Sequence, residues 1–125
     1  EEIAFRGVLL HGLRRRFHPA VLALVVGGIF GLFHGALFRV APTAYLGVVL
    51  AAVTLLSGSL YPALLWHALN NALAVVVLPR LGQEPGVALS PTVLACAAAG
   101  LAVSFWIVWR NRTPYPGLRP WRHRR

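Results

Sequence analysis

Long apolar runs, separated by arginine, proline and glycine, make up most of the chain. These interruptions predict about five helices, over residues 1–13, 19–38, 43–57, 60–78 and 91–109. The second, fourth and fifth approach the ~20 residues that a helix needs to cross a hydrocarbon core ~30 Å thick. The third is expected to be short, so it would cross a thinned bilayer or be partly re-entrant. The pattern therefore predicts an all-α fold, a multi-pass transmembrane helical bundle.

The composition narrows the class of protein. Of the 125 residues 58% are hydrophobic, the mean hydropathy is +0.68, and only Glu1, Glu2 and Glu84 are acidic. These values exclude an ordinary soluble domain and a disordered tail. The formal charge of +9 comes from arginines that flank the apolar runs. We therefore expect a lipid bilayer as partner and no nucleic acid.

The arginines also predict an orientation. If all five helices cross, nine arginines lie on one side of the membrane, in the loop at 14–16 and in the tail, and only Arg39 and Arg80 lie on the other. The positive-inside rule places the richer side in the cytosol, and Trp106 and Trp109 fit an aromatic belt beside it. We expect a transmembrane domain at residues 1–109 and a basic cytosolic tail at 110–125, solvated or touching lipid headgroups.

The source and completeness of the chain can be inferred only from composition. The use of Arg in place of Lys and the many alanines favour a GC-rich bacterial genome, so we expect a bacterial plasma membrane. The chain begins at Glu1 without Met and contains no Met. We therefore expect it to be truncated at its N-terminus, with further helices upstream.

Polar side chains interrupt the first helix, although an ionisable group at the bilayer centre costs about 3 kcal/mol or more. Glu2 and Arg6 are four residues apart and can form an ion pair, which leaves Glu1 without that partner. A frayed terminus would explain a lone Glu1. The adjacent ion pair favours a functional site instead.

The second and fourth helices carry the other polar positions. His34 stands among large apolar residues and glycine, and His67 shares a helical face with Asn71, with Asn70 as an alternative partner. At 1.5 Å of rise per residue, Glu1 and His34 lie about 20 and 22 Å from the arginine-rich side. His67 lies only about 10 Å in, unless its helix begins earlier or is tilted. Either histidine alone could be a hydrogen-bonded structural residue.

A stripe of small residues marks one face of the second helix. Gly27, Gly31 and Gly35 recur every four residues, a spacing that lets two helix backbones approach closely in lipid. Phe30 and His34 lie on an adjoining face. We therefore expect this stripe to pack against another helix and to fix the position of His34.

A carboxylate and a histidine in a poorly hydrated cavity can activate water for hydrolysis. Two donors aimed at the developing oxyanion are also needed, and His67 and the Asn71 amide can supply them from one helical face. Alternatively Glu1, His34 and His67 could bind zinc, because two histidines and a carboxylate form a common catalytic set. No H-E-x-x-H motif is present. The single cysteine excludes a multi-cysteine metal site.

Three motifs carry a family resemblance. They are E-E-x-x-x-R at Glu1, Glu2 and Arg6, F-x-x-x-H at Phe30 and His34, and H-x-x-x-N at His67 and Asn71. In this order on successive apolar helices, they resemble the CAAX prenyl protease and bacteriocin-processing family of intramembrane endopeptidases, the type II CAAX prenyl endopeptidase-like (Abi) family. The resemblance covers residues 1–71.

The resemblance implies a helical membrane fold with a conical cavity open to the membrane and the cytosol. It implies that Glu1, with His34, activates water, and that His67 and Asn71 stabilise the oxyanion. Glu2 and Arg6 would hold the helix and orient Glu1. A metal-independent mechanism is implied, so no cofactor is expected, with zinc as the alternative.

The substrate implied by the resemblance is a membrane-anchored or prenylated peptide or protein. Two other function classes stay open. One is a non-catalytic scaffold or bacteriocin-immunity protein of the same family, in which the polar residues only pair helices. The other is a proton or solute pathway, since intramembrane Glu and His can relay protons.

Overall fold

The computed structural model describes residues 1–80, 91–113 and 115–117, and in these residues it contains helices and no strand. The first helical segment consists of η1 (Ile3–Leu10), a π-helix, and α1 (His11–Leu13). It is followed by α2 (Pro19–Phe33) and α3 (Leu37–Ser57). Helix α4 (Tyr61–Ala72) continues directly into η2 (Leu73–Val77) and α5 (Leu78–Arg80), and α6 spans Pro91–Arg110. The prediction of an all-α fold is confirmed.

The boundary between α2 and α3 differs from the prediction. We expected the second helix to reach residue 38 and the third to begin at 43, but α2 ends at Phe33 and α3 begins at Leu37. Gly35 has a φ of +69°, a left-handed conformation that ends helices, and Ala36 is extended. Pro42 lies inside α3, near its N-terminus, and does not start a new helix. Gly35 is therefore a helix terminator, and its assignment to the packing stripe was wrong.

The lengths of the helices also depart from the prediction. Helix α3, expected to be short, has 21 residues and is, within the described ranges, the one helix long and apolar enough to cross a membrane. Helix α2, expected to approach 20 residues, has 15. Helix α6 lies within one residue of its predicted bounds. Crossings by the other helices stay a prediction.

Helices α2 and α3 pack with their backbones almost in contact. A Cβ atom added to Gly27 would lie 2.4 Å from Val48 Cγ2 and 2.5 Å from the Val48 backbone nitrogen. A Cβ atom on Gly31 would lie 2.7 Å from the Val40 carbonyl oxygen, and one on Gly47 would lie 2.9 Å from Gly27 Cα. The close-packing prediction is thus confirmed for Gly27 and Gly31.

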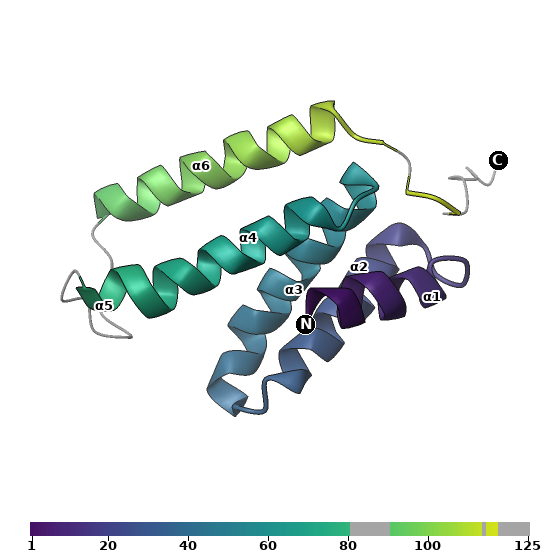
Figure 1. Ribbon diagram of the computed structural model, residues 1–125, viewed down its shortest axis with the longest axis horizontal. Coiled ribbons are helices and arrows are strands. Elements are labelled where there is room, and N and C mark those ends of the chain that lie inside the picture. The colour runs from purple at the N-terminus through teal and green to yellow at the C-terminus, as the bar shows by residue number, and fades with distance from the viewer. Residues whose placement is uncertain (81–90, 114, 118–125) are drawn as a thin grey trace.

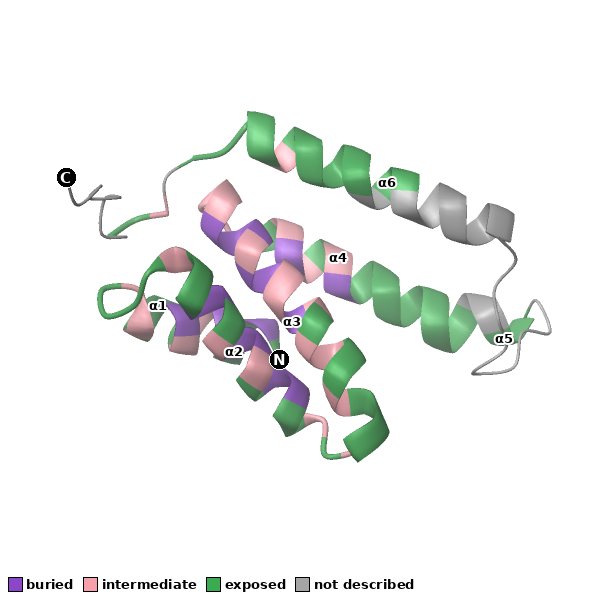
Figure 2. Cartoon of the chain, turned by 180° about the vertical axis from the view of Figure 1, so that it is seen from behind, coloured by how far each residue is buried: buried purple, intermediate pink, exposed green. Residues whose placement is uncertain are grey.

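The buried side chains gather where η1, α2 and α3 meet, whereas the coloured part of α6 and the far end of α4 are mostly exposed (Figure 2). The core cluster includes Phe5, Leu10, Leu22, Val26 and Phe30. Helix α4 packs against α3 and is inclined to it (Figure 1). Helix α4 begins at Tyr61, no earlier than expected, and His67 Nε2 lies 3.8 Å from Glu1 Oε2. The arginines of the tail from Arg119 onward lie outside the described residues.

Candidate active site

Glu2 and Arg6, near the start of the chain, form a buried ion pair. Arg6 donates from Nη1 to Glu2 Oε1 at 2.9 Å, and the Arg6 side chain is 0% exposed. Its Nη2 donates to the Gly47 carbonyl oxygen at 3.0 Å, and its guanidinium lies 4.5 Å from the centre of the Phe30 ring. A buried cation requires such partners. Arg6 therefore joins η1 to α2 and α3.

Glu2 contacts a histidine as well as the arginine. His67 Nδ1 lies 2.8 Å from the same Oε1 atom, and both side chains are buried. An ionised carboxylate only accepts, so Nδ1 carries the hydrogen and donates it to Glu2. Glu2 thus fixes the orientation of the His67 ring. The resemblance implied that Glu2 orients Glu1, whereas the contact that the structure shows is with His67.

His34 is held by its own helix. It is the C-cap residue directly after α2, and its Nδ1 lies 2.9 Å from the Phe30 carbonyl oxygen, which is one of the last carbonyls of the helix. A carbonyl only accepts, so Nδ1 is the donor and Nε2 carries the lone pair in the neutral ring. The ring also packs against Phe30, with centroids 4.7 Å apart.

Glu1 lies between the two histidines. Its Oε2 is 4.0 Å from His34 Nε2 and 3.8 Å from His67 Nε2. Its side chain is 44% exposed, in contrast to the buried Glu2 beside it. The structure therefore brings together a carboxylate at the start of the chain, an imidazole at the end of α2 and an imidazole in α4, with the carboxylate open to its surroundings.

A cleft of about 360 Å³ lies in front of this carboxylate. Its lining residues come from the start of the chain and from α4: Glu1, Glu2, Leu64, His67, Ala68 and Asn71. The cleft places the Asn71 amide on the side of α4 that faces Glu1. A peptide segment in this cleft would contact the carboxylate and the amide together.

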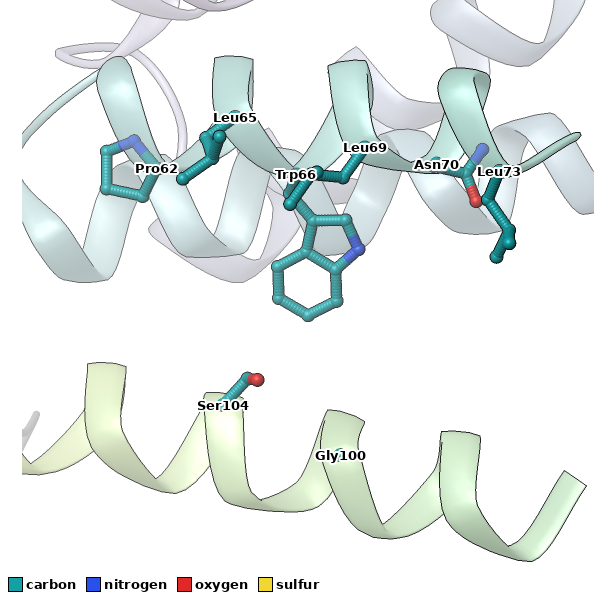
Figure 3. A pocket seen from close by; sticks show the side chains of 8 residues that line it. All are labelled: Pro62, Leu65, Trp66, Leu69, Asn70, Leu73, Gly100 and Ser104. Atoms are coloured by element: carbon teal, nitrogen blue, oxygen red, sulfur yellow. The ribbon is translucent and has the colours of Figure 1, made fainter. Parts of the chain in front are cut away.

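Asn70, the alternative partner, faces elsewhere. Trp66 and Asn70 project from α4 toward α6, into a hollow that Gly100 and Ser104 line from the other side (Figure 3). This hollow does not include Glu1 or His67. The two adjacent asparagines therefore line different hollows, and Asn71 is the one that lines the cleft with His67.

The Phe30 ring lies at the centre of the site. It makes an edge contact with His67 at 5.6 Å between centroids and another with Phe5 at 5.1 Å, besides its contacts with Arg6 and His34. Sequence reasoning included Phe30 only through its motif, and it missed Gly47. Because Gly47 has no side chain, Phe30 and the Gly27 backbone can approach it closely. The Gly47 carbonyl oxygen accepts a hydrogen bond from Arg6.

A bound metal ion requires donor atoms that lie closer together than those of Glu1, His34 and His67. In the part of the chain that the structure describes, no group of three or more His, Cys, Asp or Glu is arranged to hold one. Two donor atoms on one tetrahedral zinc lie about 3.4 Å apart. The oxygen-to-nitrogen distances from Glu1, 3.8 and 4.0 Å, are wider than this.

Fold and site together define a helical protein in which a glutamate and two histidines meet beside an apolar core. The family described as type II CAAX prenyl endopeptidase Rce1-like matches residues 1–73, more than half of the chain. The chain belongs to this family, and the family is membrane-integral. No curated protein and no solved structure matched the chain.

Proposed function

We propose that the protein is a glutamate-dependent intramembrane endopeptidase, which hydrolyses a peptide bond of a membrane-anchored or prenylated-type substrate. One observation carries the proposal: the exposed Glu1 carboxylate faces Nε2 of both His34 and His67, at 4.0 and 3.8 Å. Membership of the family supports the reaction class. The roles of the individual residues follow from their atoms.

Glu1 and His34 are two hydrogen-bond acceptors on either side of one water position. A water that donates both its hydrogens at the usual length spans two acceptors about 4.4 Å apart. The observed 4.0 Å between Glu1 Oε2 and His34 Nε2 is close to this span. The water oxygen then attacks the peptide carbonyl carbon, and its proton passes to Glu1. Glu1 returns that proton to the amine nitrogen as the C–N bond breaks.

His67 and Asn71 stabilise the negative charge that develops on the carbonyl oxygen. For this role Nε2 of His67 must carry a hydrogen, as it does in the imidazolium form, in which both ring nitrogens donate. Glu2 accepts from Nδ1 and supplies the opposite charge, so Nε2 is left to the oxyanion. The Asn71 amide in the same cleft supplies the second donor.

Glu2, Arg6 and Phe30 are positioning residues. The bond from His67 to Glu2 and the ion pair from Glu2 to Arg6 form one chain of contacts. Arg6 fixes this chain to α3 through the Gly47 carbonyl. Each of these residues acts on the substrate through His67 or His34.

Zinc is the alternative to a metal-free mechanism. If a metal were used, Glu1, His34 and His67 would be its ligands, and it would supply a polarised water. We propose the metal-free version, because Glu1 and His34 alone can bind and deprotonate the water. Activity that vanishes with a chelator and returns with zinc would reverse this choice.

We further propose the arrangement in the membrane. The helices cross a bacterial plasma membrane several times, and the arginine-rich end, with the C-terminal tail, lies in the cytosol. The apolar α3 and the many exposed apolar side chains of α4 and α6 support an intramembrane setting. The substrate is a membrane-anchored chain whose scissile bond reaches the cleft.

The test is cleavage of a membrane-anchored peptide by the complete protein in lipid vesicles. We expect Glu1→Ala and His34→Ala each to abolish cleavage, with abundance and helix content unchanged. Asn70→Ala is the matched control, because Asn70 faces away from the cleft on the same helix. Cleavage by the Glu1 or His34 variant would reject the assigned roles. Full biological activity in the triple alanine variant of Glu1, His34 and His67 would favour a non-catalytic scaffold.

A further inference from the structure

The segment that follows α6 folds back over the ends of two other helices. The Thr113 backbone nitrogen donates to the Leu56 carbonyl oxygen at 2.9 Å, at the end of α3. Beyond it, Tyr115 lies half-buried against the core cluster, with its hydroxyl 3.3 Å from His11 Nδ1. Arg14 donates from Nε to the Pro116 carbonyl oxygen at 3.0 Å. These contacts hold the end of α6 near α1 (Figure 1).

The fold-back brings arginines from two distant parts of the sequence to one end of the molecule. Arg15 and Arg16 belong to the connection between α1 and α2, directly after the anchored Arg14, and both are exposed. Arg110 and Arg112 belong to the end of α6 and the segment after it, and both are also exposed. We call these four residues the basic end.

The charge of the basic end is not neutralised by the described carboxylates. The chain has only three acidic residues, and two of them, Glu1 and Glu2, belong to the active site. Every ion pair found among the described residues involves Glu1 or Glu2. The four arginines therefore attract anions from outside the chain.

Two of these arginines are stacked on exposed indole rings. The Arg110 guanidinium lies 5.3 Å from the centre of the Trp106 ring, and the Arg112 guanidinium lies 4.6 Å from that of Trp109. The two tryptophans are 57% and 51% exposed. Indole rings beside apolar helix surface settle at the headgroup level of a bilayer. The stacked guanidinium groups then lie at the same level, where lipid phosphate oxygens accept their hydrogen bonds.

We infer that the basic end binds the headgroups of anionic phospholipids. A free phosphate would meet the arginines equally well, but it would leave the indoles and the neighbouring Phe105 and Ile107, both more than 40% exposed, in water. A lipid satisfies the guanidinium groups with its phosphate and the apolar side chains with its acyl chains. This binding is separate from the proposed peptidase activity and does not depend on it.

The test uses the complete protein in phosphatidylcholine vesicles that contain a trace of spin-labelled lipid. Electron paramagnetic resonance measures the motionally restricted fraction for labelled phosphatidylglycerol and for labelled phosphatidylcholine. The wild type should prefer phosphatidylglycerol several-fold. Because each arginine at an anionic surface contributes up to about fivefold, Arg110→Gln with Arg112→Gln should remove most of this several-fold preference. Arg15→Gln with Arg16→Gln should act in the same direction.

Arg39→Gln is the matched control. Arg39 is also exposed and also stacked on an exposed ring, with its guanidinium 5.5 Å from the centre of the Phe38 ring, but it lies at the start of α3, away from the basic end. The control should keep the preference, and so should wild type with added inorganic phosphate. Equal restriction of both lipids by the wild type would overturn the inference. An equal loss in the Arg39 variant, or displacement of the lipid by inorganic phosphate, would overturn it as well.

Discussion

Glu1 and Glu2 are neighbours in sequence but have opposite surroundings. Glu2 is buried and holds both Arg6 and His67 through one oxygen. Glu1 is 44% exposed, and its Oε2 lies 3.8 and 4.0 Å from the Nε2 atoms of His67 and His34, beyond hydrogen-bond distance. The difference separates a residue that maintains the structure from one that is available for chemistry.

Alanine substitutions at these two positions should therefore have different effects. Glu2→Ala leaves the buried Arg6 without its counter-ion, which lowers the free energy of unfolding by about 3 to 5 kcal/mol. Glu1→Ala should change it by less than about 0.5 kcal/mol, as is usual for exposed sites, while cleavage is lost. Denaturation in detergent and cleavage assays on both variants measure the two effects. A strongly destabilised Glu1 variant with an intact Glu2 variant would contradict this division.

The two adjacent asparagines allow a second comparison at the scale of single residues. Removing one donor to an oxyanion costs about 100- to 1,000-fold in kcat. Asn71→Ala should show such a loss, with little change in KM, because Asn71 lines the cleft. Asn70→Ala should stay close to wild type, since Asn70 faces α6 (Figure 3). The reverse ranking would mean that the other face of α4 carries the site.

At the scale of elements, the position of His34 depends on the contact between α2 and α3. His34 ends α2, and the two helices touch through glycines, so their spacing sets how far His34 lies from η1 and α4. Any side chain at the contact must push the helices apart. The site is thus sensitive to residues that do not contact the substrate.

Substitutions of Gly27 and Gly28 test this dependence. Gly27→Ala places a Cβ within 2.5 Å of the Val48 backbone, and overpacking of this kind costs about 1 to 3 kcal/mol. Gly28→Ala on the same helix meets nothing within 4 Å and should be neutral or slightly stabilising. The melting temperature and the cleavage rate should both fall for Gly27→Ala and not for Gly28→Ala. Equal behaviour of the two would show that the helices are not in close contact here.

The helical class, the glycine contact and the three polar motifs can be identified from the sequence, because these depend on local composition and spacing. The prediction misplaces the turn between α2 and α3, since Gly35 was assigned to the stripe and the third helix was expected to begin at residue 43. Both depend on backbone conformations that spacing does not specify. The contacts of Arg6 with Gly47 and of Glu2 with His67 join residues 41 and 65 positions apart, so only the fold reveals them.

At the scale of the whole molecule, the burial is uneven. The site and the core lie on one side, between η1, α2, α3 and the first turns of α4, and large apolar side chains stay exposed along the rest of α4 and the second half of α6 (Figure 2). Exposed apolar surface of this extent marks a membrane or a partner. The same arrangement places the active site and the basic end in different regions, so that cleavage and lipid binding can be altered separately.

The proposed mechanism requires Glu1 and His34 to act on one and the same water. A double-mutant cycle on kcat/KM tests it most directly, with Glu1→Gln, His34→Ala and both together, assayed on a membrane-anchored peptide. When two residues act on the same water, removing the second after the first causes little further loss of rate. The double variant should therefore be no slower than the slower single variant. Losses that multiply in the double variant, or a rate close to wild type after Glu1→Gln, would contradict a shared water between these two side chains.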